Sequence, residues 1–264
     1  MADGRAPNSN SDDGVFSDDE QGAVGGFYGR RVGRGLRDGQ RALLQTLLPE
    51  LAVPVDPSRP AALDPADLFP EPVTEFGLEI GFGSGEHLLA LLAARPTLGM
   101  IGCEPFTNGM ASLLRQVEDD SLGRRLRLHG DDAGPVLRHL ADASLSCIYL
   151  LFPDPWPKRR HARRRFLQPA TLDQMARLLV DNGTLRMASD HPVMVDWMMR
   201  ETRSHAAFAW QVAGVDDWRV RPADWPPTRY EAKRLHGEPC YFTFRRRPRH
   251  ASCQTFRPAT SATR

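Results

Sequence analysis

The sequence predicts an α/β fold in which helices cover both faces of a mostly parallel β-sheet. From residue 75 onward, short β-type runs alternate with segments of helical length, and this alternation is typical of parallel strands joined by crossover helices. A glycine-rich turn, Gly81-Phe82-Gly83-Ser84-Gly85, directly follows the first apolar run. In doubly wound sheets such a turn lies at the carboxyl ends of the strands, where ligands bind.

The expected elements follow one another from an N-terminal helix to a C-terminal strand. Amphipathic spacing predicts a short helix at 40–48, and the proline-rich residues 49–72 predict an ordered loop. Strands are expected at 76–82, 99–104, 125–129, 144–152, 183–189, 208–212 and 241–245. Helices between them are expected at 86–94, 108–118, 133–141, 165–180 and 191–202. The last strand follows a loop rich in Trp and Pro, which favours an antiparallel strand at the end of the sheet.

Composition divides the chain into one domain and two tails. Residues 1–26 are rich in Asp, Ser, Asn and Gly, which predicts a disordered acidic leader. Residues 1–25 carry a net charge of −5, so the rest of a chain with net charge +1 carries +6. A basic body of this kind points to a polyanionic partner. A single domain is expected at 27–247, followed by a flexible tail at 248–264.

Composition also disfavours several classes of protein. The four cysteines are far apart and form no CxxC pair, which argues against a zinc site and a disulfide framework. No apolar run approaches the length of a membrane span, and the N-terminus lacks the basic and apolar regions of a signal peptide. We therefore expect a cytoplasmic protein with no metal and no membrane contact.

The spacing of the glycine turn favours a cationic ligand. The dinucleotide fingerprint is GxGxxG, whereas this turn reads GxGxG, with Glu86 at the position of the third glycine. A carboxylate there repels the pyrophosphate that a helix N-terminus otherwise binds. S-adenosylmethionine carries a sulfonium and an ammonium and has no phosphate. Gly81 and Gly83 allow the backbone to approach such a ligand, and Glu79 can accept hydrogen bonds from it. The alternative is a tight turn that binds no ligand.

Acidic residues also end the next two expected strands. Glu104 lies 23 residues after Gly81, near the spacing at which a carboxylate binds a ribose diol in nucleotide-binding folds. Asp131 and Asp132 end the third strand. An Asp at this point either accepts from an adenine amino group or caps the following helix. Three strands that end in acids together indicate a ligand site at one sheet edge.

A rigid corner follows the apolar run at 148–152. Pro153-Asp154-Pro155-Trp156 stops the strand, because its two prolines fix φ and remove two backbone donors. The corner displays the Asp154 carboxylate and the Trp156 ring, which either stacks on an unpaired base or plugs the loop from beneath. A basic run comes next, and Lys and Arg side chains in such a run neutralise phosphates. Its members are Lys158, Arg159, Arg160, His161, Arg163, Arg164 and Arg165.

Two later motifs have both a binding and a capping interpretation. Asp190 follows a strand end and either contacts a ligand or caps the next helix. Thr228 and Glu231 are spaced either to bind a base edge or to form a capping box.

Several motifs together resemble the bacterial tRNA (guanine-N7)-methyltransferase family. They are FYGRRVGRGLRDGQ, LEIGFGSGEHL, LFPDPWPKRRHARRR, ASDHP and TRYEAKR, within about residues 27–247. The resemblance implies a Rossmann-like class I methyltransferase fold with a seven-stranded, mostly parallel sheet and one antiparallel strand. It implies methyl transfer from S-adenosylmethionine to N7 of guanine 46 in the variable loop of tRNA, by a monomer or a homodimer.

The resemblance also implies roles for individual residues. Asp154 is the catalytic candidate. The implied cofactor contacts are Glu79, Gly81, Gly83, Glu104, Asp132 and Asp154. The implied tRNA contacts are Lys158, Arg160, His161, Arg163, Arg164, Arg165, Asp190, Thr228, Arg229, Tyr230 and Glu231. Pro105 departs from the aliphatic residue that is usual in the family after the acid, and the choice of Asp132 over Asp131 rests on the Ala that follows it.

Two other functions remain as hypotheses. One is a methyltransferase that acts on an exocyclic amine or a protein, although such enzymes often carry an Asn/Asp-Pro-Pro-aromatic corner in place of the corner found here. The other is a non-catalytic RNA-binding protein, which the intact glycine turn and the strand-end acids disfavour.

Overall fold

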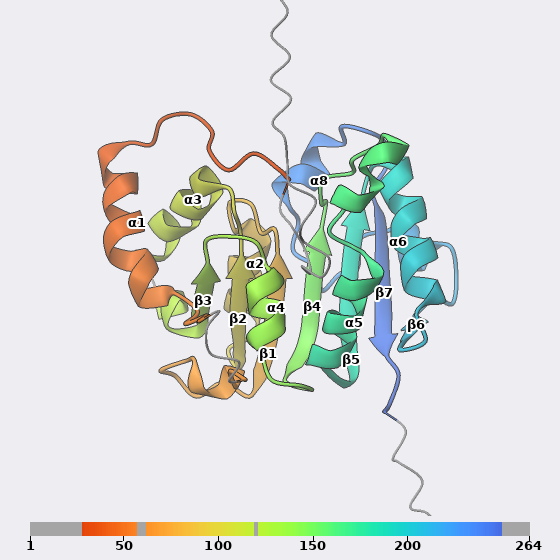
Figure 1. The fold of residues 1–264 in the computed structure, drawn as a ribbon, viewed down its shortest axis with the longest axis horizontal. Coiled ribbons are helices and arrows are strands. Elements are labelled where there is room, and N and C mark those ends of the chain that lie inside the picture. Colours follow the sequence, from red (N-terminus) through yellow and green to blue (C-terminus); the bar gives the residue numbers. More distant parts are fainter. Residues whose placement is uncertain (1–27, 57–61, 119–120, 250–264) are drawn as a thin grey trace, which may run out of the picture.

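The computed structural model describes residues 28–56, 62–118 and 121–249, which build a seven-stranded sheet of order β3-β2-β1-β4-β5-β7-β6 (Figure 1). The leader expected at 1–26 and most of the expected C-terminal tail lie outside the described residues. The strands are β1 (Glu75–Ile80), β2 (Leu98–Cys103), β3 (Leu126–His129), β4 (Leu145–Leu151), β5 (Leu179–Ser189), β6 (Phe208–Trp210) and β7 (Cys240–Arg246).

The antiparallel strand lies inside the sheet and not at its end as predicted. β1 pairs in parallel with β2 and β4, β2 pairs in parallel with β3, and β4 pairs in parallel with β5. β7 runs antiparallel to both β5 and β6, which flank it. Tyr241 and Phe242 are consecutive in β7, and each is buried in a different hydrophobic core, one on each face of the sheet. Both faces of β7 are therefore buried, as expected of a strand inside the sheet. The short β6 forms the edge.

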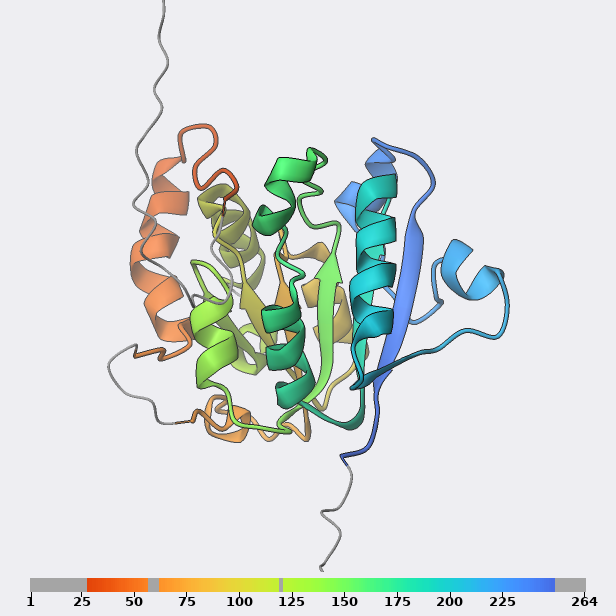
Figure 2. The same cartoon turned by 45° about the vertical axis from the view of Figure 1, so that its right-hand side comes forward.

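Helices cover both faces of the sheet. One face carries α4 (Gly134–His139), α5 (Pro169–Leu178) and α6 (Pro192–Ser204), and the other carries α1 (Asp38–Leu51), α2 (Glu86–Ala94) and α3 (Thr107–Val117) (Figures 1 and 2). Each face has its own hydrophobic core. In β4, Ile148 and Leu150 enter the first core, whereas Cys147, Tyr149 and Leu151 enter the second. Burial on both faces explains why this strand reads as a continuous apolar run.

Several helix boundaries differ from the expectation. The helix expected from residue 165 begins at Pro169, where proline suits the first helical position and Gln168 and Thr171 form reciprocal capping hydrogen bonds. β5 then starts at once after α5, four residues earlier than expected. The segment at 159–164 is instead a 3-10 turn, η3 (Arg159–Arg164). The remaining short elements are η1 (Pro65–Asp67), η2 (Ser121–Arg125), α7 (Asp216–Arg219) and α8 (Arg229–Lys233).

The described residues contain no helix long and apolar enough to cross a bilayer. Within the same ranges, no group of three or more His, Cys, Asp and Glu side chains is placed to hold a metal ion.

Candidate active site

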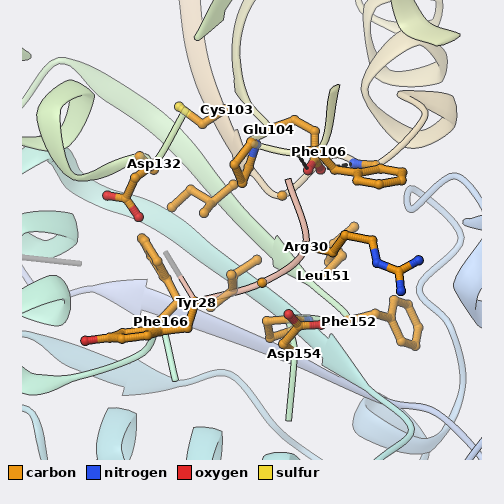
Figure 3. A pocket seen from close by; sticks show the side chains of 18 of the residues that line it. Tyr28, Arg30, Cys103, Glu104, Phe106, Asp132, Leu151, Phe152, Asp154 and Phe166 are labelled. Carbon is orange, nitrogen blue, oxygen red and sulfur yellow. Dashed lines mark hydrogen bonds between the residues drawn. The ribbon is translucent and has the colours of Figure 1, made fainter. Parts of the chain in front are cut away.

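A cavity of about 360 Å³ opens at the carboxyl ends of β1, β2 and β4. The glycine turn, the ends of β2 and β4, and the corner at 152–156 form its walls (Figure 3). Its size falls within the range of small-molecule sites, roughly 300–1,000 Å³. The cavity lies at the sheet edge that the glycine turn and the strand-end acids predicted.

The backbone of the glycine turn adopts conformations that residues with a side chain rarely adopt. Gly81, Gly83 and Gly85 have φ values of +75°, +61° and +85°, all in the left-handed region. A Cβ on Gly85 would lie 2.3 Å from Leu113 Cδ1 of α3, whereas one on Gly81 would meet nothing within 4 Å. Gly85 therefore also permits α3 to pack against the turn, and Gly81 leaves open space beside the cavity.

Glu104 is the most enclosed carboxylate of the cavity wall. It is 7% exposed, and its two carboxylate oxygens accept hydrogen bonds from the backbone amides of Gly83, at 2.6 Å, and Phe106, at 2.8 Å. Burial raises the pKa of Glu104, and the nearby acids Asp154 and Glu79 raise it further, against the opposing effect of the two amides. The residue thus connects the β1 and β2 loops and presents an acid to the cavity.

The structure separates the two adjacent aspartates at the end of β3. Asp132 lines the cavity, and its carboxylate also accepts from the backbone amide of Gly134, the first residue of α4, at 2.7 Å, although the N-cap position itself is Ala133. Burial is the main cause that raises the pKa of Asp132. Asp131 instead pairs with Arg31 at 2.5 Å and is absent from the cavity wall. The choice of Asp132 agrees with this placement, and its contact with the cofactor stays a prediction.

The corner that carries Asp154 has an unusual backbone on both sides of the acid. Phe152 and Trp156 have φ values of +50° and +40°, and each such non-glycine residue costs on the order of 1–3 kcal/mol. Asp154 is exposed at the cavity mouth, yet its carboxyl lies among the surrounding walls, and the loss of water there raises its pKa. Figure 3 shows Glu104, Asp132 and Asp154 on different sides of one cavity.

Trp156 is half-buried and lines the cavity. Its ring lies edge-on to His161, with centroids 5.9 Å apart, and the Arg164 guanidinium lies 5.1 Å from its centre. Base stacking by Trp156 remains a prediction.

Glu79 lies apart from the main cavity. It is 2% exposed, and its carboxylate is 2.8 Å from Nδ1 of His87, which is equally buried. Both residues line a small second hollow beside the glycine turn. His87 was not predicted as a site residue, and the available signal was its position in the first turn of α2, one residue after Glu86. His87 Nε2 has no hydrogen-bond partner among the described residues.

Helix α8 covers the glycine turn. Thr228 and Glu231 form the capping box, with the Glu231 amide 3.1 Å from the Thr228 hydroxyl, so the capping alternative is confirmed. The Glu231 carboxylate also accepts from Tyr241 at 2.7 Å. Arg229 pairs with Glu86 at 2.7 Å, and Tyr230 reaches the cavity wall. Contact between this helix and tRNA stays a prediction.

The Arg-rich segment before α1 crosses the cavity mouth, a position that the sequence analysis missed. Tyr28 and Arg30 line the cavity (Figure 3). The segment is held to the body by the Arg31–Asp131 ion pair and by a hydrogen bond from the Thr107 amide to the Arg31 carbonyl, at 2.9 Å. No signal of this contact with α3 is present in the sequence.

The basic run divides into outward and inward side chains. Lys158, Arg160 and Arg163 are exposed on and beside η3, where a polyanion can reach them. Arg164 lies over the rings of both Trp156 and Tyr28. Arg165 departs from the expectation that it lies along the RNA, because it is only 5% exposed and donates to carbonyls of the corner.

Asp190 is not the cap of α6. That cap is His191, whose ring nitrogen accepts from the Val193 amide at 3.2 Å. The Asp190 carboxylate instead accepts from the His236 amide at 3.1 Å, and so links the β5 end to the loop before β7. Its predicted contact with tRNA remains open to test.

The donor set of the cavity fits S-adenosylmethionine. Carboxylates on three strand ends suit a ligand with a sulfonium and an ammonium, and the side-chain-free Gly81 and Gly83 permit close approach of an amino acid group. Glu104, at the end of β2, is placed to accept from a ribose diol, and Asp132 to accept from an adenine amino group.

Comparison with known proteins identifies the family. Residues 74–241 match a family model described as "Putative methyltransferase". A tRNA (guanine-N(7)-)-methyltransferase of Rhodospirillum rubrum is 50% identical over 236 residues, covering 88% of this chain and 92% of the relative. Proteins with the same name in Paramagnetospirillum magneticum and Rhizobium meliloti are each 48% identical, covering 84% and 85% of this chain and 93% and 96% of the relatives. With these motifs, this cavity and such relatives, the chain belongs to the tRNA (guanine-N7)-methyltransferase family.

Proposed function

We propose that the protein transfers a methyl group from S-adenosylmethionine to N7 of guanine 46 in the variable loop of tRNA. The observation that supports this most is the placement of Asp154. Its carboxylate lies on a rigid corner at the mouth of a carboxylate-lined cavity, and an exposed basic run begins four residues later. The names of the relatives above state methyl transfer to guanine N7 of tRNA. Because the proposed substrate is tRNA, we propose that the protein acts in the cytoplasm.

Methyl transfer to guanine N7 requires no proton transfer by the protein to form the nucleophile. When bound, S-adenosylmethionine supplies a methyl group on a positively charged sulfur. Guanine N7 attacks with its own lone pair, so the N7–C bond forms as the C–S bond breaks and its electron pair stays on sulfur. No general base is needed, because N7 carries no proton. The cavity must align the reacting atoms in line and exclude water.

Asp154 is suited to stabilise the charge that develops during transfer. Positive charge moves from sulfur to the purine ring, and a carboxylate at the cavity mouth interacts with both positions. Partial burial by the cavity walls raises the pKa of Asp154, and an interaction between charges is stronger beside such walls than in open water. We assign Asp154 an electrostatic and orienting role.

The exposed basic side chains next to this corner suit the tRNA backbone. Lys158, Arg160 and Arg163 supply sequence-independent affinity for phosphates. Because η3 follows the corner directly, RNA bound there would deliver a base to Asp154. This arrangement supports a nucleic-acid substrate over a protein substrate.

Mass spectrometry of nucleosides tests the proposal. An unmodified tRNA transcript with guanine at position 46 is incubated with the protein and S-adenosylmethionine, digested and analysed. We expect 7-methylguanosine from this transcript and none from a matched transcript with adenine at that position. Absence of 7-methylguanosine from the first transcript would overturn the proposal, and methylation elsewhere in the RNA would overturn the assignment of position 46.

A further inference from the structure

Arg165 is buried directly beneath the corner that carries Asp154. Its Nε donates to the Pro155 carbonyl at 3.0 Å, and one terminal nitrogen donates to the Trp156 carbonyl at 3.1 Å. Two nitrogens of one planar guanidinium thus hold two successive peptide carbonyls. Only the rigid fork of arginine offers this geometry.

The guanidinium rests on a second residue from a different element. The indole of Trp197, on α6, lies 4.4 Å from the Arg165 guanidinium carbon. Trp197 is itself fixed, because its Nε1 donates to the Leu167 carbonyl at 2.6 Å. Gln168 also donates to the Arg165 carbonyl at 2.9 Å. Arg165 is therefore held from both sides and cannot swing outward without breaking these contacts.

The part of the corner held by Arg165 is the part that needs support. Trp156 has the left-handed φ of +40°, an unfavourable conformation for a large side chain. Pro155 and Trp156 directly follow Asp154 in the chain, and the carbonyls of both accept hydrogen bonds from Arg165. Loss of these two hydrogen bonds would free the peptide to leave this conformation and would shift Asp154 with it.

We propose that Arg165 is a positioning residue that fixes Asp154 for methyl transfer, with Trp197 as its support, and that it does not bind tRNA phosphates. This inference rests on the proposed function and deepens it. It separates Arg165 from the exposed members of the same basic run, such as Arg163.

The two roles predict different kinetics. A phosphate contact acts on tRNA affinity and on its salt dependence, whereas a misplaced catalytic group lowers turnover at saturating substrate, by about a hundredfold for a displacement near 1 Å. We expect Arg165→Met to lower kcat about ten- to hundredfold, with the Kd for tRNA and its salt dependence unchanged. Arg165→Lys keeps the charge and loses the fork, so it should not restore kcat.

Two further variants keep the test decisive. Trp197→Leu removes the support without removing a cation, and should reproduce the loss of kcat with tRNA affinity intact. Arg203→Met is the matched control, because Arg203 is exposed and also lies near an indole, 5.8 Å from the Trp210 ring centre, away from the corner. We expect wild-type kinetics from it. Thermal unfolding of each variant identifies any that fail to fold.

The outcomes are distinct. If Arg165→Met raises the Kd for tRNA and lowers its salt dependence while kcat holds, or if Arg165→Lys restores kcat, Arg165 is a phosphate ligand and the inference is wrong. If the Arg165→Met variant does not fold, the Trp197→Leu variant decides the test. A folded Trp197→Leu variant with wild-type kcat would then overturn the inference. If the wild-type protein makes no 7-methylguanosine, the proposed function fails first.

Discussion

At the residue scale, the cavity is defined by carboxyl groups that are kept poorly hydrated. Burial raises the pKa of Glu104, Asp132 and Asp154, and a cationic ligand offsets the cost of ionising them there. These acids come from the ends of β2, β3 and β4, and lie close together only because parallel strands end at one edge.

The first prediction concerns Asp154. Asp154→Asn keeps the size of the side chain and removes its charge, so the positive charge that develops on the purine loses its partner. We expect turnover to fall about a hundredfold, in line with the loss of one electrostatic stabiliser. Single-turnover methylation at saturating tRNA and S-adenosylmethionine measures it. Full turnover by the variant would rule out the assigned role.

The second prediction concerns pH. The raised pKa values mean that the folded protein holds these protons more tightly than the unfolded chain, so the contribution of these acids to the free energy of unfolding grows as pH falls. The predicted cofactor contacts use the ionised acids, so we expect the affinity for S-adenosylmethionine to fall as these acids take up protons. Calorimetric titration from pH 8 to 5 measures the affinity.

Urea unfolding of Asp154→Asn provides the control for the pH prediction. The variant lacks this titrating carboxyl, so the free energy of unfolding of the variant relative to the wild type should fall as pH falls. A cofactor affinity that stays constant or rises toward pH 5 would contradict the prediction.

At the scale of elements, the glycine turn and α3 depend on each other. Gly85 combines a φ of +85° with a Leu113 atom 2.3 Å from the position of a Cβ. Gly85→Ala therefore adds left-handed strain and overpacking, together about 2–4 kcal/mol of destabilisation. Urea denaturation measures this change in the free energy of unfolding.

Gly39 is the matched control for that prediction. It lies within α1, and a Cβ there would meet nothing within 4 Å. Gly39→Ala should stabilise the protein by about 0.5–1 kcal/mol, because alanine favours the helix. If Gly85→Ala were neutral or stabilising like this control, the strain and close packing would not be required by the fold.

At the scale of the whole molecule, the exposed basic side chains make tRNA binding sensitive to salt. Lys158, Arg160 and Arg163 are exposed together beside the corner. Replacement of any one by Ala should lower the slope of log K against log salt by about one. Fluorescence anisotropy of labelled tRNA at several salt concentrations measures the slope. An unchanged slope in the triple Ala variant would place the RNA on another surface.

The fold was largely predictable because its signals are local. Apolar runs buried on both faces, such as β4, and prolines that stop a strand act through neighbouring residues alone. The helix predicted at 165–180 is present as α5, but its start was predicted four residues early, because the charged residues before it resemble a helix start whereas Pro169 and the Gln168 cap set the real beginning. The interior place of β7 also escaped prediction, since strand order depends on contacts across the sheet.

Four features could be predicted from the amino-acid sequence alone: the strand-helix alternation, the glycine turn, the strand-end acids and the proline corner that displays Asp154. Each of these follows from the conformational limits or the polarity of a few adjacent residues. Only the tertiary structure decided that Asp132 and not Asp131 faces the cavity, that Glu79 pairs with His87, and that Arg165 turns inward. These outcomes depend on partners far along the chain, such as Arg31 and Trp197, and a side chain's direction is set by the partner that the fold brings to it.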